Sequence, residues 1–281
     1  MHYSFPMNKL GTEERVRVVA ALIEGNSLRS TTRMTGIHRT TIMKLLADLG
    51  EACAEYQDQA FVNLKCERIQ CDEIWSFVYA KEKNCSPEMK AEGAGDAWTW
   101  VALDANTKLV PCWLVGGRDA GYAYDFMIDL ASRLAKRVQL TTDGHRAYLT
   151  AVDMTFGEDI DYSMLVKMYG DAPKTDERRY SPATVTGTRK KTISGTPDKE
   201  HVSTSYVERQ NLTMRMSTRR FTRLTNGFSK KIDNHRHSLA LHYMNYNFAR
   251  IHQTLRVTPA MAAGVSDHVW SIAGIVALLK D

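Results

Sequence analysis

Residues Arg68-Ile-Gln-Cys-Asp-Glu-Ile-Trp-Ser-Phe-Val-Tyr79 mark the centre of the predicted structure. This run is rich in β-branched and aromatic side chains and nearly free of turn residues, which is typical of a strand buried on both faces of a sheet. One carboxylate, Asp72, stands in its middle. A carboxylate in a buried strand must be protonated, paired or bound to a cation, so Asp72 is the first candidate functional residue.

Two further acids stand in equally particular settings. Asp143 follows the predicted short strand 138–142, and Glu208 lies in the segment Ser205-Tyr-Val-Glu-Arg-Gln-Asn211 of a predicted helix over 203–215. Taken singly, each acid is explained as the polar end of an ordinary element, and Asp143-Gly144 alone is a common turn. Taken together, three acids in this order on these elements favour one shared site.

The pattern along the chain predicts an α/β fold. Strands are expected at 68–79, 97–104, 109–115, 138–142 and 160–169. Helices are expected at 12–24, 27–34, from 38 to about 65, 123–135, 203–215 and 229–251, with small helices in 258–280. This order resembles the ribonuclease H-like fold, a mixed sheet flanked by helices, in which the first strand is central and the fourth lies beside it. Asp72 and Asp143 would then lie close together, and a helix packed across that edge would supply Glu208.

The first 60 residues predict a small all-α DNA-binding domain. A helix capped at Thr12, a short helix capped by Ser27, a turn at Gly36 and a third helix from His38 follow the helix-turn-helix layout. A generic three-helix packing element is the alternative. Short hydroxyl and basic side chains at the start of the third helix favour groove reading. The residues expected in a major groove are Arg39, Thr40, Thr41 and Lys44, and those expected in the core are Ile42, Leu45 and Leu46.

Composition limits the class of protein. The 281 residues suffice for the small domain at 1–60 and a catalytic domain at 66–281, with 170–202 as a basic insert loop and helices at the C-terminal end. No window is long and apolar enough to span a membrane and no leader is evident, which predicts a cytoplasmic protein. Five cysteines without a CxxC pair argue against a disulfide framework or a zinc ribbon.

Positive charge is concentrated in one part of the chain. The whole chain has a net charge of +5, but residues 174–236 hold fifteen Lys/Arg against six Asp/Glu. A solvated basic face is one interpretation. The other is a track for a nucleic acid backbone, because clustered Arg and Lys displace its counterions.

Three carboxylates brought together predict a site for divalent metal. Without a cation, their mutual repulsion would raise at least one pKa sharply. Carboxylate oxygens suit Mg²⁺ or Mn²⁺, and two such ions roughly 4 Å apart would activate a water or 3′-hydroxyl and stabilise the leaving oxygen of a phosphodiester.

The helix around Glu208 adds a second signal. Glu208, Asn211 and Arg215 fall at i, i+3 and i+7 and therefore share one face, which combines a metal ligand, a polar contact and a phosphate-binding cation. The residues predicted to contact DNA in this region are Arg209, Asn211, Arg215, Arg219, Arg220 and Arg223.

Several motifs resemble those of one family. These are Cys71-Asp-Glu-Ile-Trp-Ser-Phe77, Thr141-Thr-Asp-Gly-His-Arg-Ala-Tyr148, Ser205-Tyr-Val-Glu-Arg-Gln-Asn-Leu-Thr-Met-Arg215 and Arg223-Leu-Thr-Asn-Gly-Phe-Ser-Lys230. Together they resemble the DDE transposases of bacterial insertion sequences, and most closely the insertion sequence 1 family. The segment Tyr246-Asn-Phe-Ala-Arg-Ile-His-Gln-Thr-Leu255 is similar to a C-terminal signature of integrase-type catalytic cores.

The resemblance implies a function. Asp72, Asp143 and Glu208 would be the catalytic metal ligands for cleavage at terminal inverted repeats and strand transfer into target double-stranded DNA, within a homo-oligomeric complex. The chain departs from the family in lacking a cysteine-based zinc finger ahead of the helix-turn-helix and in its longer segment between Asp143 and Glu208. The alternatives are a structure-specific nuclease or resolvase of the same fold, and a catalytically silent DNA-binding regulator.

Overall fold

The N-terminal helices begin and end at local signals in the sequence. The computed structural model describes residues 10–170, 185–222 and 225–279. Helix α1 (Thr12–Ile23) is preceded by Gly11, so the expectation that Thr12 is the capping residue is wrong by one position. Helix α2 (Leu28–Thr35) starts at Ser27, whose hydroxyl accepts from Ser30 N at 3.0 Å, and stops at Gly36 in a left-handed conformation. Helix α3 (Arg39–Ala60) follows directly.

A six-stranded mixed sheet forms the centre of the molecule. Its strands are β1 (Arg68–Val78), β2 (Gly95–Asp104), β3 (Cys112–Gly116), β4 (Gln139–Thr142), β5 (Asp161–Tyr169) and β6 (Val185–Ser194). They lie in the order β3-β2-β1-β4-β5-β6, with β1 parallel to β4, β4 parallel to β5, and the other neighbours antiparallel. The predicted α/β class with a central first strand beside the fourth is therefore confirmed.

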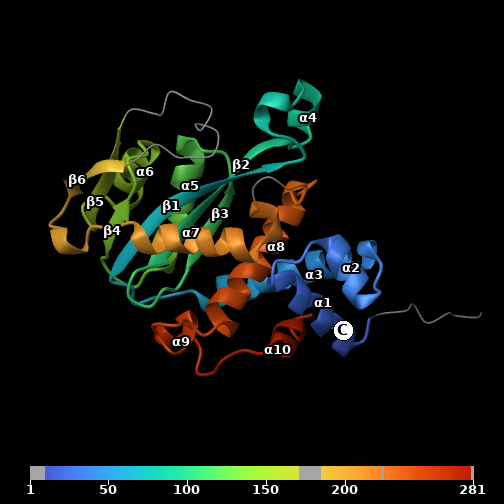
Figure 1. Ribbon diagram of the computed structural model, residues 1–281. Coiled ribbons are helices and arrows are strands. Elements are labelled where there is room, and N and C mark those ends of the chain that lie inside the picture. Colours follow the sequence, from blue (N-terminus) through green and yellow to red (C-terminus); the bar gives the residue numbers. More distant parts are fainter. Residues whose placement is uncertain (1–9, 171–184, 223–224, 280–281) are drawn as a thin grey trace, which may run out of the picture.

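Helices cover both faces of this sheet (Figure 1). Helices α5 (Ala120–Arg133) and α6 (Ala147–Phe156) pack on the face that buries Trp100. Helices α7 (Ser205–Ser217) and α8 (Ile232–Met244) pack on the face that buries Val101, the next residue along β2. Because successive side chains of a strand point to opposite faces, the sheet requires both layers.

Helices α1 to α3 pack against the C-terminal helices and share one hydrophobic core with the sheet (Figure 1). Helix α3 approaches α8 closely at Gly50, where a Cβ atom would lie 2.5 Å from His237 Cβ. The remaining short helices are η1 (Glu82–Asn84), α4 (Pro87–Ala91), η3 (Lys199–His201), η4 (Arg219–Phe221), the π-helix η5 (Asn245–Ala249), α9 (Pro259–Ala262) and α10 (Ile272–Val276).

The prediction of a basic loop over residues 170–202 is wrong for part of that segment. Residues Val185–Ser194 form β6, which pairs with β5, while 171–184 lie outside the described residues. The strand is exposed along most of its length, so its sequence lacks the apolar alternation of a half-buried strand. Its Arg189, Lys190 and Lys191 are typical of a sheet edge that is protected from further pairing. Helix α6 was not predicted either.

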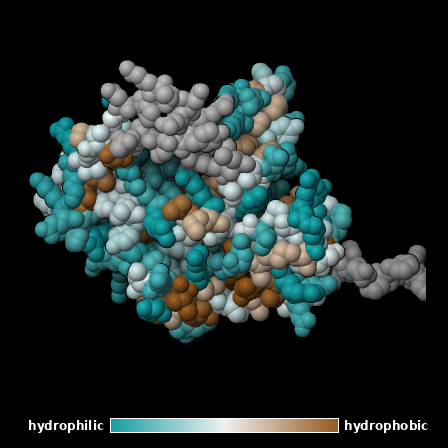
Figure 2. Space-filling model, viewed as in Figure 1, coloured by the Kyte–Doolittle hydropathy of each residue, from teal (hydrophilic) through white to brown (hydrophobic). Residues whose placement is uncertain are grey.

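The surface of the face in Figure 2 is mostly hydrophilic, and its hydrophobic residues gather mainly around α9 and α10. Among the described residues, no helix has both the length and the apolar character needed to cross a membrane.

Candidate functional site

Asp72 and Asp143 lie side by side because their strands are neighbours. Strands β1 and β4 are parallel and pair Cys71 with Thr142, the last residue of β4. Asp72 and Asp143 are the residues that directly follow this pair. Carboxylate oxygens of Asp72, Glu73 and Asp143 all lie within 4.8 Å of one another. This spacing allows a single cation to contact all three groups.

The environment of Asp72 disfavours its negative charge. Burial and the nearby charges of Asp143 and Glu208 together raise the pKa of Asp72 to about 6, although hydrogen bonds from the backbone and from Asn211 act in the opposite direction. The Asn211 amide Nδ2 donates to Asp72 Oδ2 at 2.9 Å. A bound cation would relieve the repulsion among these acids.

Glu208 lies next to this cluster and is held by a lysine. Lys167 Nζ lies 2.6 Å from Glu208 Oε1, and the Thr204 hydroxyl donates to the same oxygen at 2.5 Å. Burial lowers the pKa of Lys167, but the hydrogen bond to Glu208 and the charges of Glu208 and Asp72 outweigh it, so that the pKa is raised. Of the three predicted acids, two thus meet directly, and the third is a neighbour whose carboxylate is paired with an ammonium group.

A second cation faces the site from the other side. Arg118 Nε donates to Glu73 Oε2 at 3.0 Å, and Arg118 Nη2 lies 3.9 Å from Asp143 Oδ2. The guanidinium also lies 4.5 Å from the Trp98 ring centroid, which fixes its plane. The Glu73 side chain is fully buried, and burial together with the charge of Asp143 raises its pKa to about 7.

Sequence reasoning missed Glu73, Arg118 and Lys167. Glu73 is adjacent to Asp72, so strand alternation assigns it to the opposite face of the sheet. Asp143 stands just beyond the end of β4, and its carboxylate oxygens lie within the same 4.8 Å group as those of both neighbours. No local sequence pattern indicates that the Asp143 carboxylate lies beside both Asp72 and Glu73.

The donor set fits a hard divalent cation. Asp72, Glu73, Asp143 and the adjacent Glu208 offer only oxygen atoms, which Mg²⁺ and Mn²⁺ prefer. In addition, the buried Asn211 Oδ1 has no hydrogen-bond partner among the described residues. Four cysteines are buried, and burial raises the pKa of each thiol: Cys53, Cys66, Cys71 and Cys112. The charges of Glu73, Asp72 and Asp143 add to this effect at Cys71, which directly precedes Asp72.

The predicted groove-reading residues of α3 share one surface. Arg39, Thr40, Thr41 and Lys44 are all exposed, whereas Ile42, Leu45 and Leu46 are buried in the core as expected. The exposed group begins at the first residue of α3 and is therefore free to approach a partner with the N-terminal end of the helix.

The other predicted DNA contacts occupy different positions. Arg209 is exposed, and Arg215, Arg219 and Arg220 are half-buried. Asn211 is buried with its amide bonded to Asp72, so it lies at the carboxylates and not on an open surface. Arg223 lies outside the described residues.

Comparisons with known proteins give structural likeness alone. No family model matches the chain, and no curated protein matches it. Among solved structures, a piggyBac transposase synaptic complex with hairpin DNA is 9% identical with a TM-score of 0.46, over 99% of this chain and 73% of that one. A Mos1 mariner paired-end complex with Mn and a Mos1 transposase paired-end complex with the left transposon end are each 11% identical with a TM-score of 0.22. This chain covers 59% of each Mos1 chain, over 55% of its own length.

Proposed function

We propose that this protein is a metal-dependent DNA transposase. The observation that carries the proposal is the convergence of Asp72, in the middle of β1, and Asp143, just beyond the end of the neighbouring parallel β4, with Glu208 on a helix packed over them. Buried carboxylates that lie close together despite their mutual repulsion are typical of functional sites. Metal-assisted phosphodiester chemistry is the reaction class that this donor set serves best.

Each residue has a role in the proposal. Asp72, Asp143 and Glu208 would hold the divalent ions, two Mg²⁺ or Mn²⁺, and the bound ions would supply activation of the attacking hydroxyl and stabilisation of the leaving oxygen. Asn211 orients Asp72 through its amide, and it is therefore proposed as a positioning residue. Arg118 is partly exposed, and its Nη2 lies 3.9 Å from Asp143 Oδ2, where the guanidinium would bind a phosphate oxygen.

The DNA substrate would contact two surfaces. The exposed start of α3 would enter the major groove of the element ends, and the basic residues that follow Glu208 would hold the backbone. We further propose that the protein acts as a homo-oligomer on paired DNA ends, at the nucleoid of a bacterial cytoplasm, as the family resemblance implies.

The test is a strand-transfer assay on a plasmid that carries the DNA flanking the gene, with Mg²⁺ or Mn²⁺. Joined products that disappear in Glu208→Gln would support the transposase and the third ligand. Cleavage without joining would favour the nuclease alternative. Binding to the flanking ends without cleavage in either metal would contradict the proposal and leave a DNA-binding regulator.

A further inference from the structure

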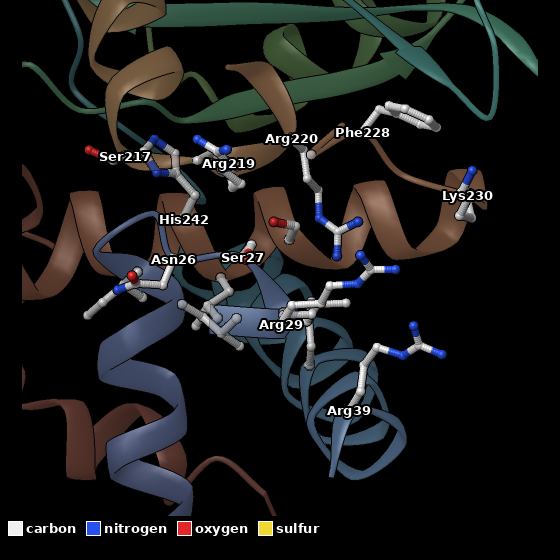
Figure 3. A pocket seen from close by; sticks show the side chains of 18 of the residues that line it. Asn26, Ser27, Arg29, Arg39, Ser217, Arg219, Arg220, Phe228, Lys230 and His242 are labelled. Atoms are coloured by element: carbon white, nitrogen blue, oxygen red, sulfur yellow. The ribbon is translucent and has the colours of Figure 1, made fainter. Parts of the chain in front are cut away.

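A cationic cleft lies between the N-terminal helices and the catalytic part of the chain (Figure 3). Its volume is about 550 Å³, and it is lined by the α1–α2 loop, the start of α3, residues of the segments 217–220 and 226–230, and one side of α8. Figure 3 shows Arg29 and Arg39 on the side formed by α2 and α3, and Arg219 and Arg220 on the opposite side.

The charges of this cleft are unbalanced. Arg29, Arg39, Arg219, Arg220 and Lys230 line it, and no Asp or Glu does. None of the five cations lies within ion-pair distance of a carboxylate in the part of the chain that the structure describes. Gathering like charges without a counter-ion is unfavourable, so the cleft is complementary to a polyanion.

Arg220 shows that this is more than a solvated basic surface. Its guanidinium is half-buried and donates to Ser229 Oγ at 2.7 Å, and burial lowers the pKa of Arg220 to about 10. A desolvated cation without a carboxylate partner is costly. An incoming anionic ligand would offset that cost.

We infer that this cleft binds backbone phosphates of the same DNA duplex that α3 contacts. The inference rests on the proposed function. It commits to duplex DNA because Arg39 lines the cleft and is also the first residue of α3, next to the exposed Thr40 and Thr41. Phosphate contacts beside a groove-reading helix fix its register on the duplex.

Helix α7 sets the distance between the cleft and the carboxylates. Glu208 lies near the start of this helix, and Ser217, its last residue, lines the cleft. Nine residues at about 1.5 Å per residue give about 14 Å, which corresponds to about four base-pair steps of 3.4 Å. For a duplex that runs parallel to α7, the phosphates held in the cleft would lie about four base pairs from the reacting phosphate.

The first test uses the double variant Arg29→Gln/Arg219→Gln, because both side chains line the cleft and neither forms an ion pair with a carboxylate among the described residues. The matched control is Lys136→Gln, a surface lysine that precedes β4 at the end of the sheet away from Asp143. Binding of a fluorescent duplex from the flanking DNA, and of an unrelated duplex, is measured by anisotropy across about 50–200 mM salt.

The expected result is weaker binding to both duplexes and a slope of log affinity against log salt that is shallower by about 2, since each lost phosphate contact contributes about 0.9. The control should keep the wild-type slope. An unchanged slope in the double variant, with wild-type melting behaviour, would overturn the inference.

The second test locates the contact. Single neutral methylphosphonates are placed along the cleaved strand, and those about four base pairs from the nick should weaken wild-type binding but not binding by the double variant. If methylphosphonates weaken binding equally in the wild type and the double variant at every position, the proposed position of the phosphate contact would be contradicted. Metal-dependent nicking that Asp143→Asn abolishes is scored separately, so the proposed function can stand if the cleft fails.

Discussion

Lys167 Nζ lies 2.6 Å from Glu208 Oε1, where it neutralises the acid that stands beside the Asp72 and Asp143 pair. The lysine extends from β5 and the glutamate from α7, two elements that are 41 residues apart along the chain at these positions. An ammonium group and a metal ion would therefore compete for the same carboxylate.

Replacing Lys167 should ease metal binding. Lys167→Met removes a partly exposed ion pair worth up to about 1 kcal/mol, so half-saturation by Mn²⁺ should occur at a concentration about two- to fivefold lower. Calorimetric titration with Mn²⁺ measures this. Lys191→Met, an exposed lysine of β6, is the control and should match wild type. An equal or weaker Mn²⁺ affinity in Lys167→Met would count against competition at Glu208.

The raised pKa of Asp72 predicts how stability depends on pH. An unfolded aspartate titrates near 3.9, and the folded group titrates at about 6, so stability is lost as pH rises through that window and the penalty is complete above it. In EDTA, Asp72→Asn should increase the free energy of unfolding by about 1–3 kcal/mol at pH 8 and change it little at pH 4. Urea denaturation at both pH values provides the measurement. The exposed Asp48→Asn is the control, and a gain of equal size at pH 4 would refute the electrostatic cause.

Arg118 should matter most where Glu73 is ionised. Arg118→Gln leaves the buried Glu73 without its cation, which should cost about 1–3 kcal/mol at pH 8.5 and less at pH 5.5, where Glu73 is protonated. The double variant Arg118→Gln/Glu73→Gln removes the buried charge and should recover most of that loss. Equal losses at both pH values, without recovery in the double variant, would show that Arg118 acts through packing on Trp98 instead.

Gly50 controls the contact between the N-terminal helices and α8. A methyl group there would meet the backbone and Cβ of His237 at 2.5–2.8 Å, so α3 and α8 would have to separate. Gly50→Ala should therefore lower the free energy of unfolding by about 1–3 kcal/mol, although alanine favours helix. Thermal melting compares it with Glu51→Ala, an exposed neighbour that should change little. A stabilised Gly50→Ala protein would contradict this packing.

The sequence predicted those parts of the structure that leave a local signal. Ser27 and Gly36 are standard helix boundary residues, and the apolar run around Asp72 is typical of a central strand. The proximity of Asp72 and Asp143 followed from the order of the elements, because β4 must lie beside β1 in the resembled fold.

The features that could not be predicted from the sequence depend on tertiary contacts. Strand β6 is paired only on one side and exposed on both faces, so its sequence carries charges in place of apolar alternation. Lys167 and Arg118 reach the acids from β5 and from the segment after β3, and neither stands in a recognisable motif. Such partners become visible only when the sheet is assembled.

The most direct test of the account is metal-specific rescue of DNA nicking in Asp143→Cys. A thiolate is a softer ligand than a carboxylate and suits Mg²⁺ poorly, whereas Mn²⁺ accepts it better. Nicking of the flanking DNA by Asp143→Cys should be lost in Mg²⁺ and partly restored in Mn²⁺, while wild type nicks in both. Wild-type nicking rates in Mg²⁺ for this variant would show that Asp143 holds no catalytic metal.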